Sequence, residues 1–305
     1  MRLADHRKGT SLETQAKRIG FVGLGVMGEP MCRNLAVKSD ATVVAFDRDT
    51  APMRRLAEHG VRGAASLREV VDGAGVVFLS LPAGEVVRDL SRQPEGLLAL
   101  ARPGQLIVDL GTSPVALTRE LAGEFAARGA TLIDAPVART RAAAEAGKLS
   151  VMVGGEPEQF ARVEPLIATF ASDVTLCGPV GCGQVVKILN NLVLFETVVA
   201  LAEVRLIGER AGVDPGLLFE TMAKGSADSF ALRNHGLKAM VPGEFPERAF
   251  SVEYARKDLR YALELARSTG VEAEGARIVD RWFGRALDAG DGGRYFPVVS
   301  RLMGG

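Results

Sequence analysis

Residues 19–28 read Ile-Gly-Phe-Val-Gly-Leu-Gly-Val-Met-Gly, a short apolar run that leads into the spacing Gly-x-Gly-x-x-Gly. In a βαβ unit the first of these glycines permits a tight turn, the second lets the backbone approach a pyrophosphate, and the third lets a helix pack closely on the strand. The stretch therefore predicts a dinucleotide site in which a helix N-terminus faces phosphates. We expect cofactor contacts from Gly23, Leu24, Gly25, Val26, Met27 and Gly28.

Outward from this stretch, short apolar or β-branched runs alternate with helical patterns, which is the rhythm of βαβ units. Further strands are expected within 41–46, 76–82, 105–110, 131–137, 149–155 and 174–177. Because these runs are continuously apolar, the sheet should be covered on both faces. After residue 178 the strand pattern stops, and helices are expected over 184–211, 215–223, 230–240, 252–269 and 272–289.

The sequence thus predicts an α/β fold with two domains. A Rossmann-type dinucleotide-binding domain covers residues 17–178, and an all-helical C-terminal domain for substrate binding and oligomerisation covers 179–305. Residues 1–16 are polar and mixed in charge, which predicts a loosely ordered extension without the apolar run of a secretory signal. The helix over 184–211 is long enough to lie along a subunit interface, although a long core helix would give the same pattern.

Composition narrows the classes of partner. The 37 basic and 37 acidic residues balance, so neither nucleic acid nor an anionic membrane is expected to bind. Three scattered cysteines and three isolated histidines give no disulfide framework, metal site or serine–histidine triad. The sequence has no run of about 18 uninterrupted apolar residues, so no membrane-spanning helix is expected. We expect a soluble cytoplasmic protein that binds a small molecule and no metal.

The second expected strand ends in Asp47-Arg48. A carboxylate at this point accepts both ribose hydroxyls of NAD and repels the 2′-phosphate of NADP. Arg48 could stack on adenine or pair with a 2′-phosphate, and it could equally be a solvated surface arginine. NAD is therefore the expected cofactor, and NADP stays open.

Beyond the glycines, residues 19–35 resemble the opening fingerprint of the 3-hydroxyisobutyrate dehydrogenase family, also called β-hydroxyacid dehydrogenases. Four further segments match in the family's order and spacing: Leu81-Pro82, Asp134-Ala135-Pro136-Val137, residues 181–191 (Gly-Cys-Gly-Gln-Val-Val-Lys-Ile-Leu-Asn-Asn) and Lys257-Asp258-Leu259. The resemblance covers nearly the whole chain. It implies an enzyme that moves a hydride between NAD(P) and a small β-hydroxy acid, such as 3-hydroxyisobutyrate or a tartronate-semialdehyde-like substrate, with cofactor contacts from Leu81 and Pro82.

The resemblance also implies roles for three polar residues. Lys187 matches the family's catalytic acid and base, and Asn191 matches the asparagine that orients the substrate. Residues i and i+4 share one helix face, although without the family this pair would fit an exposed face. A lysine base needs its pKa lowered from about 10.4 by desolvation or by nearby positive charge. Lys257 resembles the family's second lysine, near the nicotinamide end of the cofactor.

Two segments depart from the family's pattern. Where the family has Ser-Gly-Gly to receive the substrate carboxylate, this chain has Ala138-Arg139-Thr140. These three residues are still expected to bind substrate, with Arg139 either clamping a carboxylate or pointing outward from the rim. The segment 109–114, Asp-Leu-Gly-Thr-Ser-Pro, is one residue shorter than the family's. It keeps Thr112 where a cofactor-contacting threonine falls, and Ser113-Pro114 is interpreted as a helix N-cap and first helical residue.

Three other interpretations are weaker. An imine reductase on this scaffold generally replaces the lysine at position 187, and a non-catalytic dinucleotide-binding module tends to lose it. A 6-phosphogluconate-type dehydrogenase has a much longer helical domain. The individual hydroxy acid stays open, whereas the long helix and the family together indicate a homodimer or homotetramer.

Overall fold

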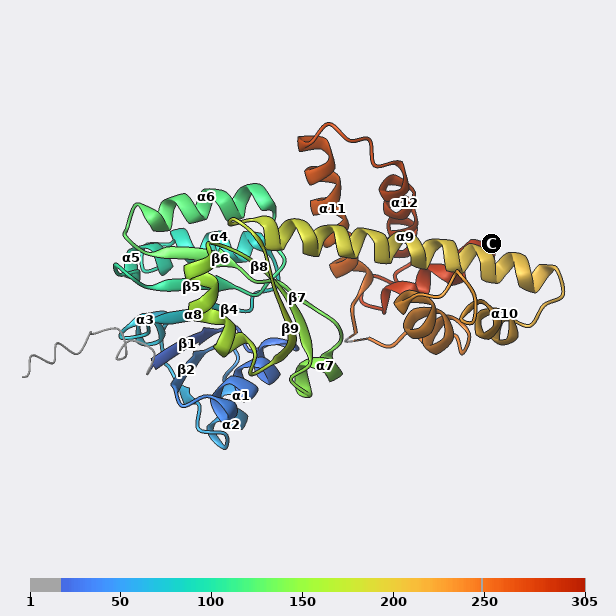
Figure 1. Cartoon of the computed structure of the whole chain (residues 1–305). Coiled ribbons are helices and arrows are strands. Elements are labelled where there is room, and N and C mark those ends of the chain that lie inside the picture. The colour runs from blue at the N-terminus through green and yellow to red at the C-terminus, as the bar shows by residue number, and fades with distance from the viewer. Residues whose placement is uncertain (1–17, 248, 305) are drawn as a thin grey trace, which may run out of the picture. The chain divides into compact units, whose positions relative to one another are not determined.

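A computed structural model describes residues 18–247 and 249–304 (Figure 1). The chain forms two compact units, of which unit 1 ends at Lys187 and unit 2 begins at Ile188. This division falls inside a helix, whereas the sequence-based boundary between residues 178 and 179 lies just before that helix. The predicted extension over 1–16 lies outside the described residues.

Unit 1 is built on one mixed sheet. Its strands are β1 (Arg18–Val22), β2 (Thr42–Phe46), β3 (Arg62–Gly63), β4 (Val76–Leu79), β5 (Leu106–Asp109), β6 (Thr131–Asp134), β7 (Val137–Ala138), β8 (Leu149–Gly154) and β9 (Ala171–Gly178). The order β3-β2-β1-β4-β5-β6 is parallel throughout, with Phe21 beside Ala45 on one strand and Phe78 on the other. β8 then runs antiparallel to β6 and β7, and β9 runs parallel to β8. The α/β, Rossmann-type prediction is confirmed.

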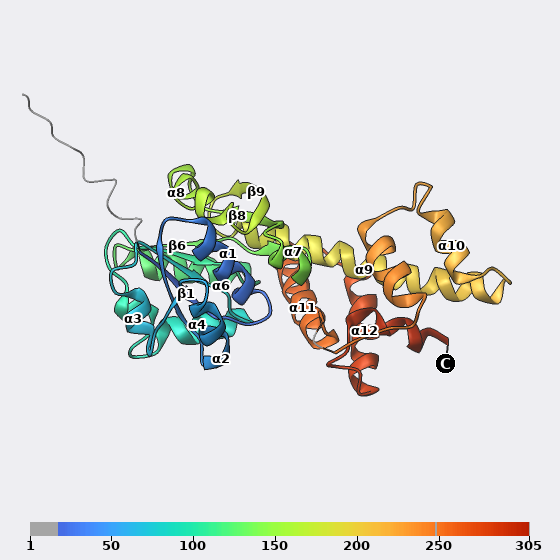
Figure 2. The same cartoon turned by 90° about the horizontal axis from the view of Figure 1, so that it is seen from below.

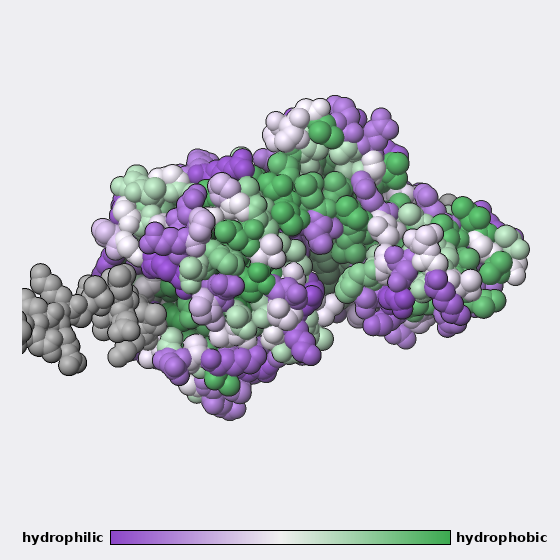
Figure 3. All heavy atoms as spheres, in the orientation of Figure 1, coloured by the Kyte–Doolittle hydropathy of each residue, from purple (hydrophilic) through white to green (hydrophobic). Residues whose placement is uncertain are grey.

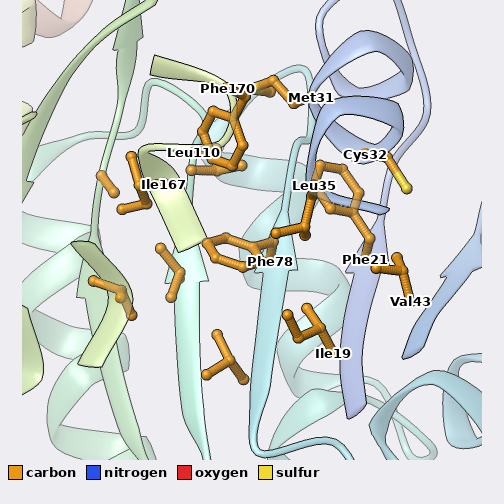
Figure 4. Close-up of a cluster of buried hydrophobic side chains, with 14 of the residues drawn as sticks. Ile19, Phe21, Met31, Cys32, Leu35, Val43, Phe78, Leu110, Ile167 and Phe170 are labelled. Carbon is orange, nitrogen blue, oxygen red and sulfur yellow. The ribbon is translucent and has the colours of Figure 1, made fainter. Parts of the chain in front are cut away.

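Helices cover both faces of this sheet, as the apolar strands predict. They are α1 (Gly28–Lys38), α2 (Thr50–Ala57), α3 (Leu67–Val71), α4 (Gly84–Arg92), α5 (Leu97–Leu100), α6 (Val115–Ala126), α7 (Arg141–Glu145) and α8 (Pro157–Ile167). Successive strand residues point to opposite faces. Phe21 belongs to the same buried cluster as Leu35 of α1 and Ile167 of α8 (Figure 4), whereas Val22 belongs to the cluster of Phe125 of α6 on the other face. Full burial of each such side chain contributes about 1.5–3 kcal/mol.

Unit 2 is helical, as predicted. Its elements are the rest of α9 (Cys182–Arg210), α10 (Pro215–Met222), the π-helix η1 (Leu232–Met240), α11 (Val252–Ser268), α12 (Glu274–Asp288) and the 3₁₀ helix η2 (Phe296–Gly304). α11 and α12 lie side by side (Figure 2). The ring of Phe195 on α9 packs 5.5 Å from that of Phe283 and 5.3 Å from that of Phe296. The part of α9 that belongs to unit 2 thus packs at the centre of the hydrophobic core of that unit.

Three details differ from the sequence-based expectation. The run 131–137 is two strands because it breaks at Ala135-Pro136, where proline lacks the N–H needed for a ladder. The short strand β3 carries no apolar run and was not predicted. α9 is, by length and composition, able to cross a membrane, although core helices pass the same test. Five of its apolar residues are buried in the core of unit 2: Phe195, Val198, Val199, Leu201 and Ala202.

Candidate active site

The predicted cofactor residues of unit 1 follow the carboxyl ends of four adjacent parallel strands. Gly23 follows β1, Asp47 follows β2, Leu81 follows β4, and Thr112 lies just beyond β5. The chain leaves β1 toward β2 and later returns to β4 on the other side of β1. Such a reversal of strand order is where open α/β sheets bind ligands. The topology therefore brings these four positions to one edge of the sheet.

The glycine turn has the shape that a dinucleotide requires. Gly23 has a φ of +92°, and a Cβ there would lie 2.2 Å from the Ser80 carbonyl oxygen. A Cβ on Gly28 would lie 2.1 Å from the Gly23 carbonyl oxygen, whereas a Cβ on Gly25 would meet no atom of the described residues within 4 Å. Among the residues that the structure describes, no side chain caps the N-terminus of α1. Gly25 thus leaves open space beside an uncapped helix N-terminus, which fits the pyrophosphate of NAD(P).

Asp47 is fixed at the end of β2 by two backbone donors. Its Oδ2 accepts from the Leu24 N–H at 2.5 Å, and its Oδ1 accepts from the Asp49 N–H at 2.8 Å. A carboxylate has about four acceptor positions, so these bonds orient it while leaving capacity for ribose hydroxyls. Arg48 is exposed. The site residues thus fit the adenosine end of a dinucleotide.

The loop between β5 and α6 is held by Asp109. The carboxylate of Asp109 accepts from the Gly111 N–H at 2.9 Å and from the Ser113 hydroxyl at 2.8 Å. Ser113 is therefore not the helix N-cap that the sequence predicts, because its hydroxyl is bonded to Asp109. Pro114 occupies the N-cap position, and α6 begins one residue later. Thr112 lies between the two residues that Asp109 holds.

Leu81 lies between the glycine turn and this loop. A Cβ on Gly23 would lie 3.2 Å from Leu81 Cδ2, and a Cβ on Gly111 would lie 2.9 Å from the Leu81 carbonyl oxygen. The next residue, Pro82, is exposed. The segments after β1, β4 and β5 are therefore in close contact, as a single cofactor site requires.

The first turn of α9 is attached to the same edge of the sheet. Asp134, at the end of β6, is fully buried, and it accepts from the Gly181 N–H at 2.6 Å and the Gln184 N–H at 2.7 Å. Burial raises the pKa of Asp134 to about 6, and the two backbone hydrogen bonds oppose that rise. The Gln184 side chain accepts from the Ser113 N–H at 3.1 Å and donates to the Gly111 carbonyl at 2.8 Å.

Lys187 and Asn191 stand one turn apart on α9. Lys187 is half-buried and is the last residue of unit 1. Asn191 is buried, and its Nδ2 donates to Oδ2 of Asp258 on α11 at 2.8 Å. Its neighbour Asn190 is exposed and donates to Asn191 Oδ1 at 3.1 Å. The spacing predicted from the sequence is present, with both amides of the Asn-Asn pair linked to each other.

Lys257 belongs to unit 2, where it lies in an aromatic and acidic setting. Its Nζ is 3.0 Å from Asp258 Oδ1, 5.1 Å from the centre of the Tyr254 ring and 5.3 Å from that of the Tyr261 ring. Cation–π contacts at such distances contribute about 0.5–2 kcal/mol each. Asp258 therefore joins the two polar residues of unit 2 that the sequence selected, Asn191 and Lys257.

Comparison with known proteins decides the family. Residues 18–178 match the family described as the NAD binding domain of 6-phosphogluconate dehydrogenase, and residues 181–301 match that described as NAD-binding of NADP-dependent 3-hydroxyisobutyrate dehydrogenase. The 3-hydroxyisobutyrate dehydrogenase of Pseudomonas aeruginosa is 37% identical over 263 residues, which are 84% of this chain and 86% of that protein. The chain belongs to the β-hydroxyacid dehydrogenase family.

Other members act on different acids. The 2-(hydroxymethyl)glutarate dehydrogenase of Eubacterium barkeri is 32% identical over 275 residues, covering 90% of this chain and 91% of that protein. A solved structure of Mycobacterium tuberculosis 3-hydroxyisobutyrate dehydrogenase with L-serine is 30% identical, with a TM-score of 0.86, and the match covers 95% of this chain and 100% of that chain. This β-hydroxyacid dehydrogenase is therefore an NAD(P)-dependent oxidoreductase that acts on hydroxyl groups, which confirms the predicted reaction class and cofactor.

The segment that departs from the family's Ser-Gly-Gly contains an unusual arginine. Arg139 has a φ of +86° and is the only residue other than glycine with a positive φ in the described part of the chain. Its guanidinium donates to the Lys148 carbonyl and to the Ser172 hydroxyl, both at 2.8 Å, and pairs with Asp173 at 2.8 Å. Clamping a substrate carboxylate would require Arg139 to leave these partners. Thr140 caps α7 and Ala138 ends β7.

Several residues of the site were not assigned roles from the sequence. Asp109, Asp134, Gln184 and Asp258 are all buried and hold the predicted residues in place. Three of them lie inside segments that match the family, yet only their burial distinguishes them from surface polar residues. A polar residue at the end of an apolar strand, as at Asp109 and Asp134, is the one signal that could have selected them. Within the described residues, no cluster of three His, Cys, Asp or Glu side chains could hold a metal.

Proposed function

We propose that the protein oxidises a small β-hydroxy acid, with Lys187 as general acid and base and Asn191 as the residue that orients the substrate. The observation that carries this proposal is the placement of both side chains one turn apart on α9, beside buried carboxylates that restrain the helix. The residues at 17–178 would bind the dinucleotide, and the helical residues at 179–305 would serve substrate binding and oligomerisation.

When bound, NAD(P)⁺ supplies the hydride acceptor. The neutral amine of Lys187 accepts the proton of the substrate hydroxyl as the carbon gives up its hydride, and the resulting ammonium returns the proton in the reverse direction. Such proton transfer contributes about 10²- to 10⁴-fold to the rate. Because a carboxylate only accepts hydrogen bonds, Asp258 fixes the Asn191 amide with its NH₂ group toward α11.

The names of the relatives narrow the substrate class. 3-Hydroxyisobutyrate, L-serine and 2-(hydroxymethyl)glutarate share a primary alcohol on the carbon next to the one that bears a carboxylate. They differ in the third substituent of that central carbon. We infer that this chain acts on the same hydroxymethyl-carboxylate unit, and that Ala138, Arg139 and Thr140 lie near the carboxylate or the third substituent.

Asp47 favours NAD over NADP. Its carboxylate is held by the Leu24 and Asp49 N–H groups at the end of β2, so it cannot move away from a 2′-phosphate without losing both bonds. Replacing Asp47 with serine should raise the kcat/KM ratio of NADP to NAD by about tenfold, equivalent to about 1.4 kcal/mol. An unchanged ratio would contradict this role and would turn attention to Arg48.

An exposed apolar face of α9 supports a homodimer or homotetramer, which we propose to be cytoplasmic. Large apolar side chains at helical spacing remain exposed, including Val193 at 62% and Ile207 at 67%. Apolar residues also gather on the molecular surface over this helix (Figure 3). Contiguous apolar surface of this kind marks interaction sites, and a two-fold interface uses the same patch twice. Light scattering should show an oligomer that Val193→Glu weakens; a wild-type monomer would contradict the proposal.

The proposed activity is tested with purified protein, NAD or NADP, and a panel of hydroxymethyl carboxylic acids with their semialdehydes. We expect reduced nicotinamide to form with at least one acid. In Lys187→Ala the rate of its formation should fall by about 10²- to 10⁴-fold, with cofactor binding retained. Full activity in Lys187→Ala would overturn the role of the lysine. If every acid fails while the reduced cofactor binds and imines are reduced, the imine reductase interpretation replaces this one.

A further inference from the structure

The N-terminus of α9 is capped from a distant strand. α9 begins at Cys182, so the Gln184 N–H is one of the first-turn donors that no intrahelical carbonyl can satisfy. Asp134 accepts this N–H through one carboxylate oxygen and the Gly181 N–H through the other. Hydrogen bonds to a charged group contribute about 1.5–3 kcal/mol each. The start of α9 is therefore fastened to the end of β6.

Gln184 fastens the same turn to a second element. Its side chain is fully buried and bridges the backbone of Ser113 and Gly111, on either side of Thr112. The loop at Thr112 and the start of α9 are thus held against each other by an amide that both donates and accepts. A shift of the helix would break at least one of these bonds.

The fit around Asp134 leaves no space for adjustment. A Cβ on Gly154 would lie 2.4 Å from Asp134 Oδ1, and a Cβ on Gly183 would lie 2.8 Å from Asp134 Oδ2 and 2.3 Å from the Met152 carbonyl oxygen. Only glycine at these two positions lets the helix approach β8 and the carboxylate so closely. The close packing of Gly154 and Gly183 around Asp134 therefore restricts where the helix can begin.

Lys187 lies three residues after Gln184, which is a rise of about 4.5 Å along the helix axis. We propose that Asp134, as the carboxylate, and Gln184 are positioning residues that fix the backbone of Lys187 against the loop at Thr112, so that turnover requires Asp134 to be ionised. This inference rests on the proposed role of Lys187. Neither residue needs to touch substrate or cofactor. Their effect on the rate is through the position of the lysine, because a misplacement of about 1 Å can lower a rate by about 10²-fold.

Protonation of Asp134 would break one of its two hydrogen bonds to the start of α9. A proton on either oxygen of Asp134 turns an acceptor into a donor opposite a backbone N–H, so only one of the two bonds survives. Burial raises the pKa of this carboxyl to about 6, within the range where activity can be measured. The charged or titratable groups that act on it are Arg119 of α6, whose positive charge lowers its pKa, and the Cys177 thiol of β9. Activity should therefore fall as the pH drops below about 6.

The test compares wild type, Asp134→Asn, Gln184→Met and the control Asp214→Asn. Asp214 also caps a helix, accepting from the Leu217 N–H at 2.9 Å at the start of α10, but that helix carries no site residue. Asn at an ordinary N-cap is equivalent to Asp. For Asp134→Asn we expect kcat to fall about 10- to 100-fold and KM for the cofactor to change less than about threefold. The acidic limb of the pH profile, which is the fall in activity below about pH 6, should disappear. Asp214→Asn should keep the wild-type kcat and limb.

Wild-type kcat with an unchanged acidic limb in Asp134→Asn would overturn the inference. If that variant does not fold, as judged by circular dichroism, Gln184→Met decides: a fall in kcat with unchanged cofactor KM supports the inference, and wild-type kcat contradicts it. Failure here is distinct from failure of the proposed function. A Lys187→Ala variant without activity, together with a fully active Asp134→Asn, removes only the positioning role, whereas an active Lys187→Ala removes the role of the lysine itself.

Discussion

Two positions on α9, Gln184 and Asn191, are each held by a buried carboxylate, and the two carboxylates belong to different units. Near Gln184 the carboxylate is Asp134 on β6 of unit 1, and near Asn191 it is Asp258 on α11 of unit 2. Asp134 binds two backbone N–H groups, whereas Asp258 binds the side chains of Asn191 and Lys257. The first carboxylate thus fixes the helix, and the second fixes functional groups. Disturbing the first should therefore have the larger effect.

The largest effect is expected when the helix start is displaced. In Gly183→Ala the new Cβ would lie 2.3 Å from the Met152 carbonyl oxygen, so α9 must move away from β8. We expect kcat to fall by about 10²-fold or more. The control is Gly123→Ala in α6, where a Cβ would meet nothing within 4 Å in the described part of the chain. It should leave kcat unchanged and add about 0.4–1 kcal/mol of stability. A Gly183→Ala enzyme with wild-type kcat would contradict the comparison.

Acid should affect the two units in opposite directions. The pKa of Asp134 is raised from 3.8 to about 6, so the native state of unit 1 binds this proton before the unfolded chain does. The stability of unit 1 therefore rises by about 3 kcal/mol as the pH falls from about 6 to 3.8. In unit 2, burial lowers the pKa of His235 from 6.5 to about 4. There the unfolded chain binds its proton first, so unit 2 loses about 3 kcal/mol as the pH falls from 6.5 to about 4.

Native-state hydrogen exchange, corrected for the intrinsic rates, measures each unit separately. Between pH 7 and pH 5, protection should rise in the strands β1 and β4 and fall in α11 and α12. His235→Phe should abolish the change in unit 2 and leave that in unit 1. A parallel response of both units in the wild type would contradict the assignment of the two groups.

A smaller effect is expected at the second carboxylate. Asp258→Asn replaces an acceptor of the Asn191 NH₂ with an amide and removes the negative charge beside Lys257. We expect kcat/KM for the hydroxy acid to fall about tenfold, with the helix start and the acidic limb of the pH profile unchanged. Asp280→Asn is the control, because Asp280 pairs with Arg256 at 2.8 Å in the same unit and is not one of the site residues. Equal losses in both variants would indicate a general loss of structure.

The smallest effect is expected at Arg139. Its backbone has the left-handed conformation that glycine adopts without strain, and a non-glycine residue there costs about 1–2 kcal/mol. Arg139→Gly would relieve this strain but lose the ion pair with Asp173, which is exposed to solvent and therefore contributes little to stability. The free energy of unfolding, measured by thermal unfolding, should therefore change by no more than about 1 kcal/mol. A large loss of stability would show that the guanidinium contacts matter more than the strain. Changed selectivity among the hydroxy acids would place this segment at the substrate.

Much of this architecture could be predicted because it is local. The glycine spacing around Gly25, the strands and the change to helices after residue 178 follow from patterns within a few residues. The family segments added Lys187, Asn191 and Lys257, which periodicity alone would have left on an exposed helix face. All of these predictions depend on residues that are close in sequence.

The remaining part of the site depends on residues far apart in sequence. Asp134 and Gln184 are 50 positions apart, and Asn191 and Asp258 are 67. Ser113 shows the same limit: its local sequence favours a helix cap, but the buried Asp109 carboxylate takes its hydroxyl. Arg139 stands in a backbone conformation that a local pattern would assign to glycine, because contacts with Lys148, Ser172 and Asp173 hold it there.

Chemical rescue of Lys187→Ala tests the central claim most directly, because it asks whether a primary amine at that one position performs the proton transfer. The variant is assayed with NAD and the preferred hydroxy acid while methylamine, then larger amines, are added at constant pH and ionic strength. The account predicts that the slow rate of Lys187→Ala rises in proportion to the free amine and that Asn191→Ala shows no such rise. A Lys187→Ala enzyme as active as the wild type, with no response to amine, would contradict it.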